Sequence, residues 1–500
     1  MNTHHISAEH LTPERIGEII KNGFKLALSD DARQRIIRCR QYLDQKIASQ
    51  TEPVYGVTTG FGSLCNVSIS KEQLSQLQVN LIKSHACGVG ERAPKDIVRI
   101  MMLLKVQSLS YGYSGCKLDT VERLIDMFNA DLIPVVYRQG SLGASGDLVP
   151  LAHLCLPLVG EGEVDINGEI VSGGEMLRRM GWKPIEMASK EGLALLNGTQ
   201  NMSAYAVWSL LEARRLSDWA DRIAAMSLDA FDGRIEPFLH AVHAVRPHLG
   251  QIETADRIRE LLDGSELISA PKVHVQDPYS FRCVPQVHGA VKDTLRYVKS
   301  VIDIEINSAT DNPTVCPDDD MIISAGNFHG EPIALPIDFL SVAMSELANI
   351  AERRIYRLVS GLRGLPDFLV ANPGLNSGFM ITQYTAASCV SLNKTLAMPS
   401  SVDSIPSCQD QEDLVSMGAN AALKLQKVIL NTERVLAIEL MNAAQALEFR
   451  FPRRSSPAIM RIHEAFRREV PFISDDVVMY PLIERAIQFL RKWEVGSGKW

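Results

Sequence analysis

The sequence predicts a mainly α-helical protein with a long central helical bundle and small β-hairpin elements. Five long stretches carry apolar residues at helical spacing, whereas only residues 161–172 carry a convincing β signal. The helical stretches cover about residues 200–230, 286–307, 334–358, 381–396 and 420–449. Several exceed the usual helix length of about 11–12 residues and are apolar on more than one face, which suits the middle of a bundle or a subunit interface.

Composition narrows the class of protein. The chain has 500 residues, of which 46% are hydrophobic, and a net charge of -8, so it carries no basic field that favours nucleic acid. The first 20 residues lack the basic and apolar regions of a signal peptide, and we find no uninterrupted apolar run that would span a bilayer. The nine cysteines form no Cys-x-x-Cys pair. We therefore expect reduced thiols and a cytoplasmic protein without nucleic-acid or membrane partners.

The elements follow in order along the chain. Residues 11–50 predict short helices with polar faces that form an N-terminal cap, and helical patterns then run from Lys71 to about His85 and from Lys95 to Tyr113. Alternating residues around Asn167-Gly168 predict a two-residue hairpin within 161–172. We expect an N-terminal domain over 1–200, and a long-helix bundle with a C-terminal helical region over 201–500, intertwined as one functional unit.

Five loops have unusual composition, and loops on a helical scaffold are where chemistry is expected. They cover residues 51–66, 140–146, 276–285, 324–332 and 399–413. The most informative stretch is Gly140-Ser141-Leu142-Gly143-Ala144-Ser145-Gly146-Asp147-Leu148, a glycine-rich turn that opens into a helix. Its simplest interpretation is a loop with Ser145 or Asp147 as N-cap and Pro150 in the first helical turn.

The same stretch also permits a backbone reaction. Gly146 has no side chain, so its nitrogen can approach the carbonyl carbon of Ala144 and close a five-membered ring. Loss of water, and then of the Ser145 hydroxyl as a second water, leaves an exocyclic methylidene on an imidazolone. The product is a carbon electrophile that needs no bound cofactor.

The stretch Gly140–Leu148 resembles the prosthetic-group segment of the aromatic amino acid ammonia-lyases and aminomutases, in particular their histidine-specific branch. The resemblance extends over nearly the whole chain. It implies an ammonia-lyase (fumarase/aspartase-like) architecture and a 4-methylidene-imidazol-5-one group (MIO) formed from Ala144, Ser145 and Gly146, with no metal and no nucleotide. It also implies a homotetramer whose active sites are shared by three subunits, so that Tyr55 and Ser145 can act in different chains.

Further segments carry the resemblance and imply catalytic roles. Tyr55 lies in a Tyr-Gly-x-x-Thr-Gly-Phe-Gly segment, where the family tyrosine is a general base. Such a base needs a pKa lowered by nearby positive charge or donors, and Arg282 is a candidate for that charge. The alternative is a packed amphipathic tyrosine. Asn197, in Leu-x-Asn-Gly-Thr, corresponds to the asparagine that contacts the carbonyl of the prosthetic group, although a helix N-cap is also open.

Two more segments supply substrate contacts by the same resemblance. In Gln276-Asp277-Pro278-Tyr279-Ser280-Phe281-Arg282, the residues Gln276 and Tyr279 would border the substrate or the prosthetic group. Arg282 would pair with the substrate carboxylate, because a planar guanidinium matches two oxygens. Phe328, in Asn327-Phe328-His329-Gly330-Glu331-Pro332, would sit by the prosthetic group or pack in the core.

The choice of substrate depends on a third set of positions. Ser84-His85 and Glu412 resemble the histidine-specific members, as does Glu331, and His85 and Glu412 would bind the imidazole. The resemblance thus implies elimination of ammonia from L-histidine to give trans-urocanate. Residues Met398, Leu414, His288 and Cys87 depart from the histidine pattern.

Three alternatives to this interpretation stay open. One is an ammonia-lyase or 2,3-aminomutase for tyrosine or another aromatic amino acid. A second is a helical scaffold without catalysis. A third, for one region, is a metal site at His240, His243 and His248, which Pro247 and the absence of a nearby carboxylate at helical spacing disfavour.

Overall fold

The computed structural model describes all residues except 1, 50–53, 68, 71–72 and 494–500. It confirms a mainly helical fold with short strands. The chain divides into two compact units, each built from separate stretches of sequence. The first holds Met1–Leu211, Lys299–Asp338 and Pro399–Leu423, and the second holds Glu212–Val298, Phe339–Met398 and Lys424–Trp500. The boundary that the sequence predicts at residue 200 stays a prediction.

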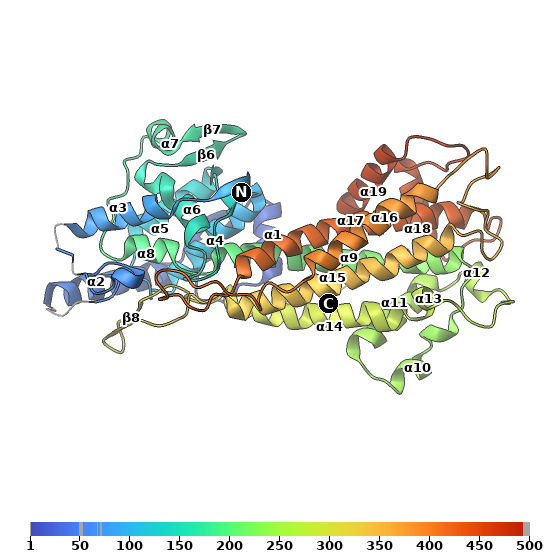
Figure 1. The fold of residues 1–500 in the computed structure, drawn as a ribbon, viewed down its shortest axis with the longest axis horizontal. Coiled ribbons are helices and arrows are strands. Elements are labelled where there is room, and N and C mark those ends of the chain that lie inside the picture. The colour runs from blue at the N-terminus through green and yellow to red at the C-terminus, as the bar shows by residue number, and fades with distance from the viewer. Residues whose placement is uncertain (1, 50–53, 68, 71–72, 494–500) are drawn as a thin grey trace. The chain divides into compact units, whose positions relative to one another are not determined.

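The first unit is mainly a cluster of helices, most of them short (Figure 1). Its helices are α1 (Pro13–Lys21), α2 (Asp30–Ser49), α3 (Leu74–His85), α4 (Lys95–Ser110), α5 (Leu118–Asn129), α6 (Leu148–Cys155), α7 (Gly173–Met180) and α8 (Glu191–Leu196), with 3-10 turns η1 (Gly62–Leu64) and η3 (Leu156–Val159). Helix α4 is buried on nearly all sides, which explains its largely apolar sequence. The predicted start of α3 at Lys71 lies outside the described residues. Helix α2 is longer than the short helices that we expect over 11–50.

Small sheets surround these helices. Strands β6 (Glu163–Ile166) and β7 (Glu169–Ser172) form the predicted hairpin, in which Asn167 and Gly168 have positive φ values of 54° and 94°. The other strands are β1 (Thr3–Ile6) paired with β2 (Lys25–Leu28), β3 (Val89–Arg92) with β5 (Tyr137–Gln139), β4 (Leu132–Pro134) with β6, and β8 (Thr314–Cys316) with β9 (Met321–Ile323). The structure thus confirms small β elements and contains strand pairs beyond the one that the sequence signals. A strand of three or four residues carries too little pattern to be recognised unless a turn signal such as Asn167-Gly168 joins it to a partner.

All five long helices predicted from the sequence are confirmed to within a few residues. They are α9 (Gln200–Ala230), α14 (Val284–Glu305), α15 (Glu331–Leu358), α16 (Met380–Leu396) and α17 (Gly418–Glu448). The remaining helices are η4 (Glu236–Phe238), α10 (His240–Ala244), α11 (Leu249–Leu262), α12 (Glu266–Ser269), α13 (Tyr279–Arg282), α18 (Pro457–Glu469) and α19 (Tyr480–Lys492).

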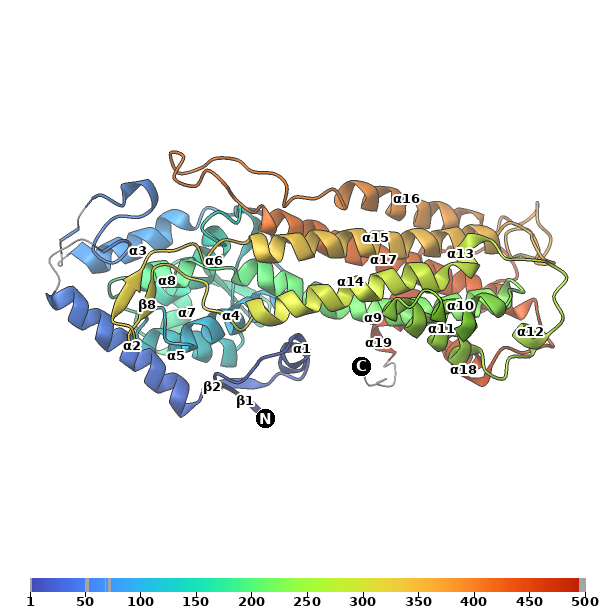
Figure 2. The same cartoon turned by 90° about the horizontal axis from the view of Figure 1, so that it is seen from below.

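Within the second unit, the long helical segments lie side by side, as the views in Figures 1 and 2 agree. Buried polar contacts join them. Arg354 of α15 pairs with Glu439 of α17 through Nε (2.6 Å) and Nη2 (2.9 Å), and Ser227 of α9 donates to the same carboxylate. These bonds satisfy charged groups that burial would otherwise penalise.

Helix α15 is long and apolar enough to cross a membrane by length and composition alone. However, 67% of its most apolar window is buried inside the structure. That burial is typical of a core helix in a bundle.

Candidate active site

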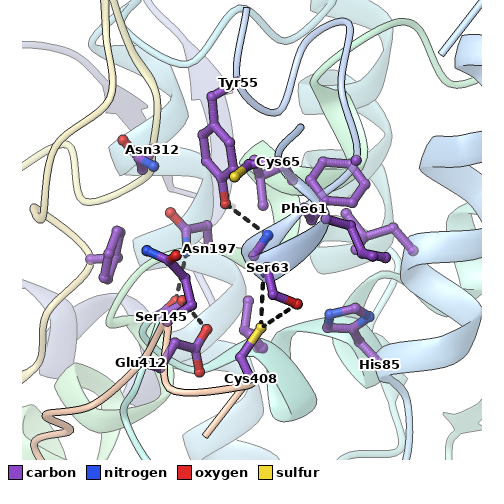
Figure 3. A pocket seen from close by; sticks show the side chains of 18 of the residues that line it. Tyr55, Phe61, Ser63, Cys65, His85, Ser145, Asn197, Asn312, Cys408 and Glu412 are labelled. Carbon is purple, nitrogen blue, oxygen red and sulfur yellow. Dashed lines mark hydrogen bonds between the residues drawn. The ribbon is translucent and has the colours of Figure 1, made fainter. Parts of the chain in front are cut away.

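A cavity of about 810 Å³ lies in the first unit and gathers most of the predicted site residues (Figure 3). Those that line it are Tyr55, His85, Ser145, Asn197, Phe328 and Glu412. They come from four of the loops singled out in the sequence and from the ends of α3 and α8. Tyr55 and Ser145, which the family resemblance implies can act in different chains, line one cavity within this chain; whether they act together in one chain or in different chains stays a prediction.

The turn that carries Ala144, Ser145 and Gly146 connects β5 to α6 and is bent tightly against Gly198. Gly146 has φ +75° and forms an isolated parallel bridge with Gly198. A Cβ added at Gly146 would lie 2.2 Å from the carbonyl oxygen of Gly198. Only glycine fits both this conformation and this approach, so the turn meets the steric condition that the backbone reaction requires.

Asp147 stabilises this turn through hydrogen bonds and is fully buried. Its backbone N–H donates to Gly198 O (2.7 Å), while its carboxylate accepts from Met202 N (2.8 Å) and Ser141 Oγ (3.1 Å). Burial raises the pKa of Asp147 to about 6, although these donors oppose the shift. Asp147 occupies the N-cap position of α6 without a side-chain capping bond, so the capping interpretation is wrong for its carboxylate.

Ser145 is fixed by two residues that are distant in sequence. Its carbonyl oxygen accepts from Asn197 Nδ2 (2.6 Å), and its Oγ donates to Glu412 Oε1 (2.7 Å). Asn197 is the C-cap residue of α8 rather than an N-cap, and its Oδ1 is buried without a hydrogen-bond partner among the described residues. Both the carbonyl and the hydroxyl that the ring chemistry involves are therefore held in place.

Tyr55 faces the same cavity, and its Oη accepts from the N–H of Gly62 (3.2 Å). Burial raises the pKa of Tyr55, and the Gly62 donor opposes this rise. The expectation that the pKa is lowered by Arg282 is thus not met within one chain, because the largest influence is desolvation of the phenolate.

One face of helix α3 also lines the cavity. Its members recur at helical spacing and are Leu77, Asn80, Leu81, Ser84 and His85. His85 Nδ1 lies 3.0 Å from Ser84 Oγ. Burial lowers the pKa of His85 below 6.5, while the Leu81 carbonyl and Glu412 oppose this change. A neutral imidazole here can both donate and accept hydrogen bonds.

Two cysteines that line the cavity were not predicted as site residues from the sequence, although both lie in loops that the sequence singled out. Cys408 has φ +53°, and its Sγ accepts from the N–H of Ser63 (3.4 Å), while Cys65 lies nearby on the Tyr55 side of the cavity (Figure 3). The segment is pinned because Ser407 and Glu412 exchange two backbone hydrogen bonds, at 2.9 and 3.2 Å. No sequence pattern indicates this pairing, because a six-residue loop closed on itself has no periodicity.

Gln276, Tyr279 and Arg282 lie together in the second unit and do not line this cavity. Arg282 Nη1 donates to Gln276 Oε1 (2.8 Å), and the Arg282 guanidinium stacks on the Tyr279 ring at 4.5 Å. The Tyr279 side chain is exposed. The three residues thus form a cluster of their own, next to Asp277, which pairs with Arg363 (2.5 Å).

The positions that depart from the histidine pattern have different surroundings. Met398 and Leu414 are exposed, and Cys87 is exposed as well. His288 is buried, with Nδ1 2.8 Å from Asp221 Oδ1. Burial raises the pKa of Glu331, the first residue of α15.

The ring of His243, one of the three histidines of the alternative metal site, is engaged within the protein. Its Nε2 lies 3.0 Å from Pro237 O, and its Nδ1 lies 2.9 Å from Gln251 Nε2. Since a carbonyl only accepts, Nε2 is the donor and Nδ1 accepts from the amide. Both nitrogens of this imidazole are used by structural bonds.

Comparison with known proteins places this arrangement in a family. A family model described as aromatic amino acid lyase matches residues 11–468. Histidine ammonia-lyase of Caldanaerobacter subterraneus subsp. tengcongensis is 49% identical over 492 residues, which cover 98% of this chain and 97% of the relative.

Solved structures agree in fold. The crystal structure of histidine ammonia-lyase from Trypanosoma cruzi matches with a TM-score of 0.91 and 39% identity, over 98% of this chain and 93% of that chain. Tyrosine aminomutase from Streptomyces globisporus matches with a TM-score of 0.92 and 35% identity, over 98% and 97%. The chain belongs to the aromatic amino acid lyase family.

Proposed function

We propose that this protein is a histidine ammonia-lyase that eliminates ammonia from L-histidine to give trans-urocanate. The observation that carries the proposal is the meeting of Ser145 with Glu412, through a 2.7 Å hydrogen bond, in a cavity that His85 also lines. An imidazole and a carboxylate next to a serine in a glycine turn suit a substrate with an imidazole ring and an amine. The 49% identity to histidine ammonia-lyases over nearly the full chain supports the same choice.

The prosthetic group would be MIO, formed from Ala144, Ser145 and Gly146, and the residues present fit it. Gly146 fills a place where a Cβ would meet Gly198 O at 2.2 Å, and Asn197 donates to the carbonyl oxygen of Ser145. When formed, the group supplies a carbon electrophile to the substrate. No metal or nucleotide enters the proposal.

Tyr55 would take the β-proton of the substrate at its Oη. The Gly62 N–H that donates to this oxygen would stabilise the phenolate that accepts the proton. Because burial raises the pKa of Tyr55 in the single chain, a positive charge supplied on assembly would favour the phenolate. Arg282 of another subunit is the proposed source of that charge.

The other site residues would bind and orient. His85 and Glu412 would hydrogen-bond the imidazole, Arg282 would pair with the carboxylate, and Gln276 and Tyr279 would border the substrate. Phe328 would close the side of the cavity next to the turn. Because Arg282 and Tyr279 belong to the second unit, this assignment goes together with a homotetramer whose active sites are shared between subunits.

Exposed apolar side chains support such an assembly. Leu335, Phe339 and Val342 on α15 are 39–51% exposed, and large apolar groups on one helix favour burial against a partner. All nine cysteines are free thiols, which supports the proposed cytoplasmic location.

A second candidate is a lyase or 2,3-aminomutase that acts on tyrosine. The TM-score of 0.92 to a tyrosine aminomutase, at 35% identity, supports this second candidate. The exposed Met398 and Leu414, which depart from the histidine pattern, point the same way. The two reactions differ in whether ammonia leaves or adds again at the β-carbon, which depends on how long the site stays closed.

The test is to incubate the full-length protein separately with L-histidine and with L-tyrosine, and to follow the near-ultraviolet absorbance of the conjugated acid. We expect product from histidine, and no turnover by the Ser145→Ala variant, whose β-carbon has no leaving group. Product from tyrosine alone would replace the first candidate by the second. Full activity of Ser145→Ala would exclude both.

A further inference from the structure

A buried lysine lies directly behind the segment that faces the tripeptide turn. Lys105 of α4 is 1% exposed, and its ammonium donates to Ala194 O (3.1 Å) and Asn197 O (2.9 Å). The neighbouring buried lysine, Lys190, pairs instead with Asp311 at 2.5 Å. The hydrogen bonds of Lys105 thus go to backbone carbonyls rather than to a carboxylate.

A buried ammonium group of this kind lowers the stability of the folded state. Burial lowers the pKa of Lys105 to about 8, with Asp311 opposing the change, which reflects the penalty for an ammonium removed from water. A methionine of similar length would fill the same space without that penalty. The ammonium therefore contributes through the two carbonyls that it holds.

Both carbonyls belong to the end of α8, where the chain leaves the helix at Asn197 in an extended conformation (φ -83°, ψ 139°). A cation at this position satisfies terminal carbonyls that lack helical partners and interacts favourably with the helix dipole. Because a peptide unit is planar, fixing Asn197 O also fixes the N–H of Gly198. Lys105 thereby sets the direction in which residues 197–198 run.

Residues 197–198 are the surface against which the reactive turn is bent. Asn197 Nδ2 donates to Ser145 O (2.6 Å), and Gly198 O accepts from Asp147 N (2.7 Å). Gly146 pairs with Gly198 as an isolated bridge. These contacts of Ser145, Gly146 and Asp147 with residues 197–198 thus depend on a segment that Lys105 anchors from the far side.

We propose that Lys105 is a positioning residue for closure of the ring at Ala144, Ser145 and Gly146. In that step, Gly146 N bonds to the carbonyl carbon of Ala144, whose oxygen leaves as water with the hydrogens of Gly146 N and Ser145 N. Ser145 then loses its Oγ–H together with its α-hydrogen as a second water, so no oxidant or reductant is required. Lys105 acts by keeping the Asn197–Gly198 segment rigid, so that the turn stays bent while the bond forms. This inference rests on the proposed function.

The experiment follows the loss of two waters by intact mass in newly synthesised full-length protein, independently of activity. We compare wild type with Lys105→Met, Lys105→Gln and, as a matched control, Lys292→Met. Lys292 is also buried, and it bonds to Asp221 and to Thr254 Oγ1 (2.7 Å) in the second unit. Samples are taken over time from the folded fraction isolated by gel filtration.

We expect Lys105→Met to slow the double dehydration about tenfold, since a small misplacement of reacting atoms costs up to about 100-fold in rate. Lys105→Gln keeps a neutral amide donor group and should have an intermediate rate. This variant tests the inference if Lys105→Met does not fold. Lys292→Met should lower the thermal midpoint and leave the rate of dehydration in its folded fraction unchanged.

Wild-type rates in both Lys105 variants would overturn the inference, as would equal slowing in Lys292→Met. Failure of the proposed function has different signatures. Without the prosthetic group, wild type itself would retain the mass of both waters; with a substrate other than histidine, wild type would lose both waters but give no product from histidine.

Discussion

Asn197 Nδ2 donates to the carbonyl oxygen of Ser145 at 2.6 Å, across 52 residues of sequence. The bond aims an amide donor at an oxygen that would belong to the prosthetic group. Placing a donor of this kind where negative charge develops is the most effective form of electrostatic stabilisation in enzyme sites.

Replacing this donor tests its contribution. Asn197→Ala should lower kcat about 100- to 1000-fold, the usual cost of removing one such donor. Asn197→Asp should be at least as severe, because a carboxylate oxygen would face the Ser145 carbonyl. Steady-state kinetics with histidine, and intact mass to follow ring formation, are the measurements. Equal activity of Asn197→Ala and wild type would contradict the assignment.

Gly146 and Gly168 make a matched pair for the steric condition. Both have positive φ, at 75° and 94°, but a Cβ at Gly146 would meet Gly198 O at 2.2 Å, whereas nothing lies within 4 Å at Gly168. Gly146→Ala should prevent the double dehydration and abolish turnover. Gly168→Ala should cost about 1–2 kcal/mol of stability through backbone strain alone and keep activity. Intact mass and thermal unfolding separate the two outcomes.

Tyr55→Phe removes the proposed base while keeping the ring in place. We expect kcat to fall about 10²- to 10⁴-fold, the usual contribution of a general base, with little change in KM. Since the pKa of Tyr55 is raised, kcat of wild type should rise with pH as the phenolate forms. A pH–rate profile of both proteins is the check. A variant that retains the alkaline rise would exclude Tyr55 as its source.

Substrate choice should depend on His85 and Glu412. Glu412→Gln keeps the size of the side chain but removes the charge that accepts from Ser145 Oγ. It should lower kcat/KM for histidine about tenfold or more, in line with loss of a hydrogen bond to a charged group. His85→Leu should lower it further and reduce discrimination against phenylalanine and tyrosine. Competition between these amino acids, with products separated by chromatography, gives the ratio directly.

His288 should make the protein sensitive to acid. Its Nδ1 lies against Asp221 (2.8 Å), and its Nε2 lies 3.4 Å from Arg354 Nη1, so a second ring proton would face a guanidinium. Burial lowers the pKa of His288 to about 4 from 6.5. Between pH 6.5 and 4, His288 is protonated in the unfolded chain but stays neutral in the folded chain. The contribution of His288 to stability is therefore fully present above pH 6.5 and decreases as the pH falls toward 4.

The size of this loss is about 2–3 kcal/mol, following the shift of the pKa. Urea unfolding at pH 7.5 and pH 5 measures it. His288→Gln offers the control, because an amide can donate to Asp221 and accept from Arg354 without titrating. An unchanged acid dependence in this variant would show that other groups cause it.

By itself, the sequence determined the long helices, the hairpin at Asn167-Gly168, and the loops that carry reactive side chains. These features are local, because apolar spacing, turn residues and the Ala-Ser-Gly order are encoded within a few turns of chain. The other short strands were not predicted, because three or four residues without a turn signal such as Asn-Gly carry too little pattern.

Only the tertiary structure decided which loops meet. Ser145 and Glu412 are 267 residues apart, and no periodicity links them. It also decided that Asp147 serves the turn rather than capping α6, that burial raises the pKa of Tyr55, and that Lys105 lies behind Asn197. The physical reason is that desolvation and hydrogen-bond partners depend on which surfaces are buried together, and that is a property of the packed chain.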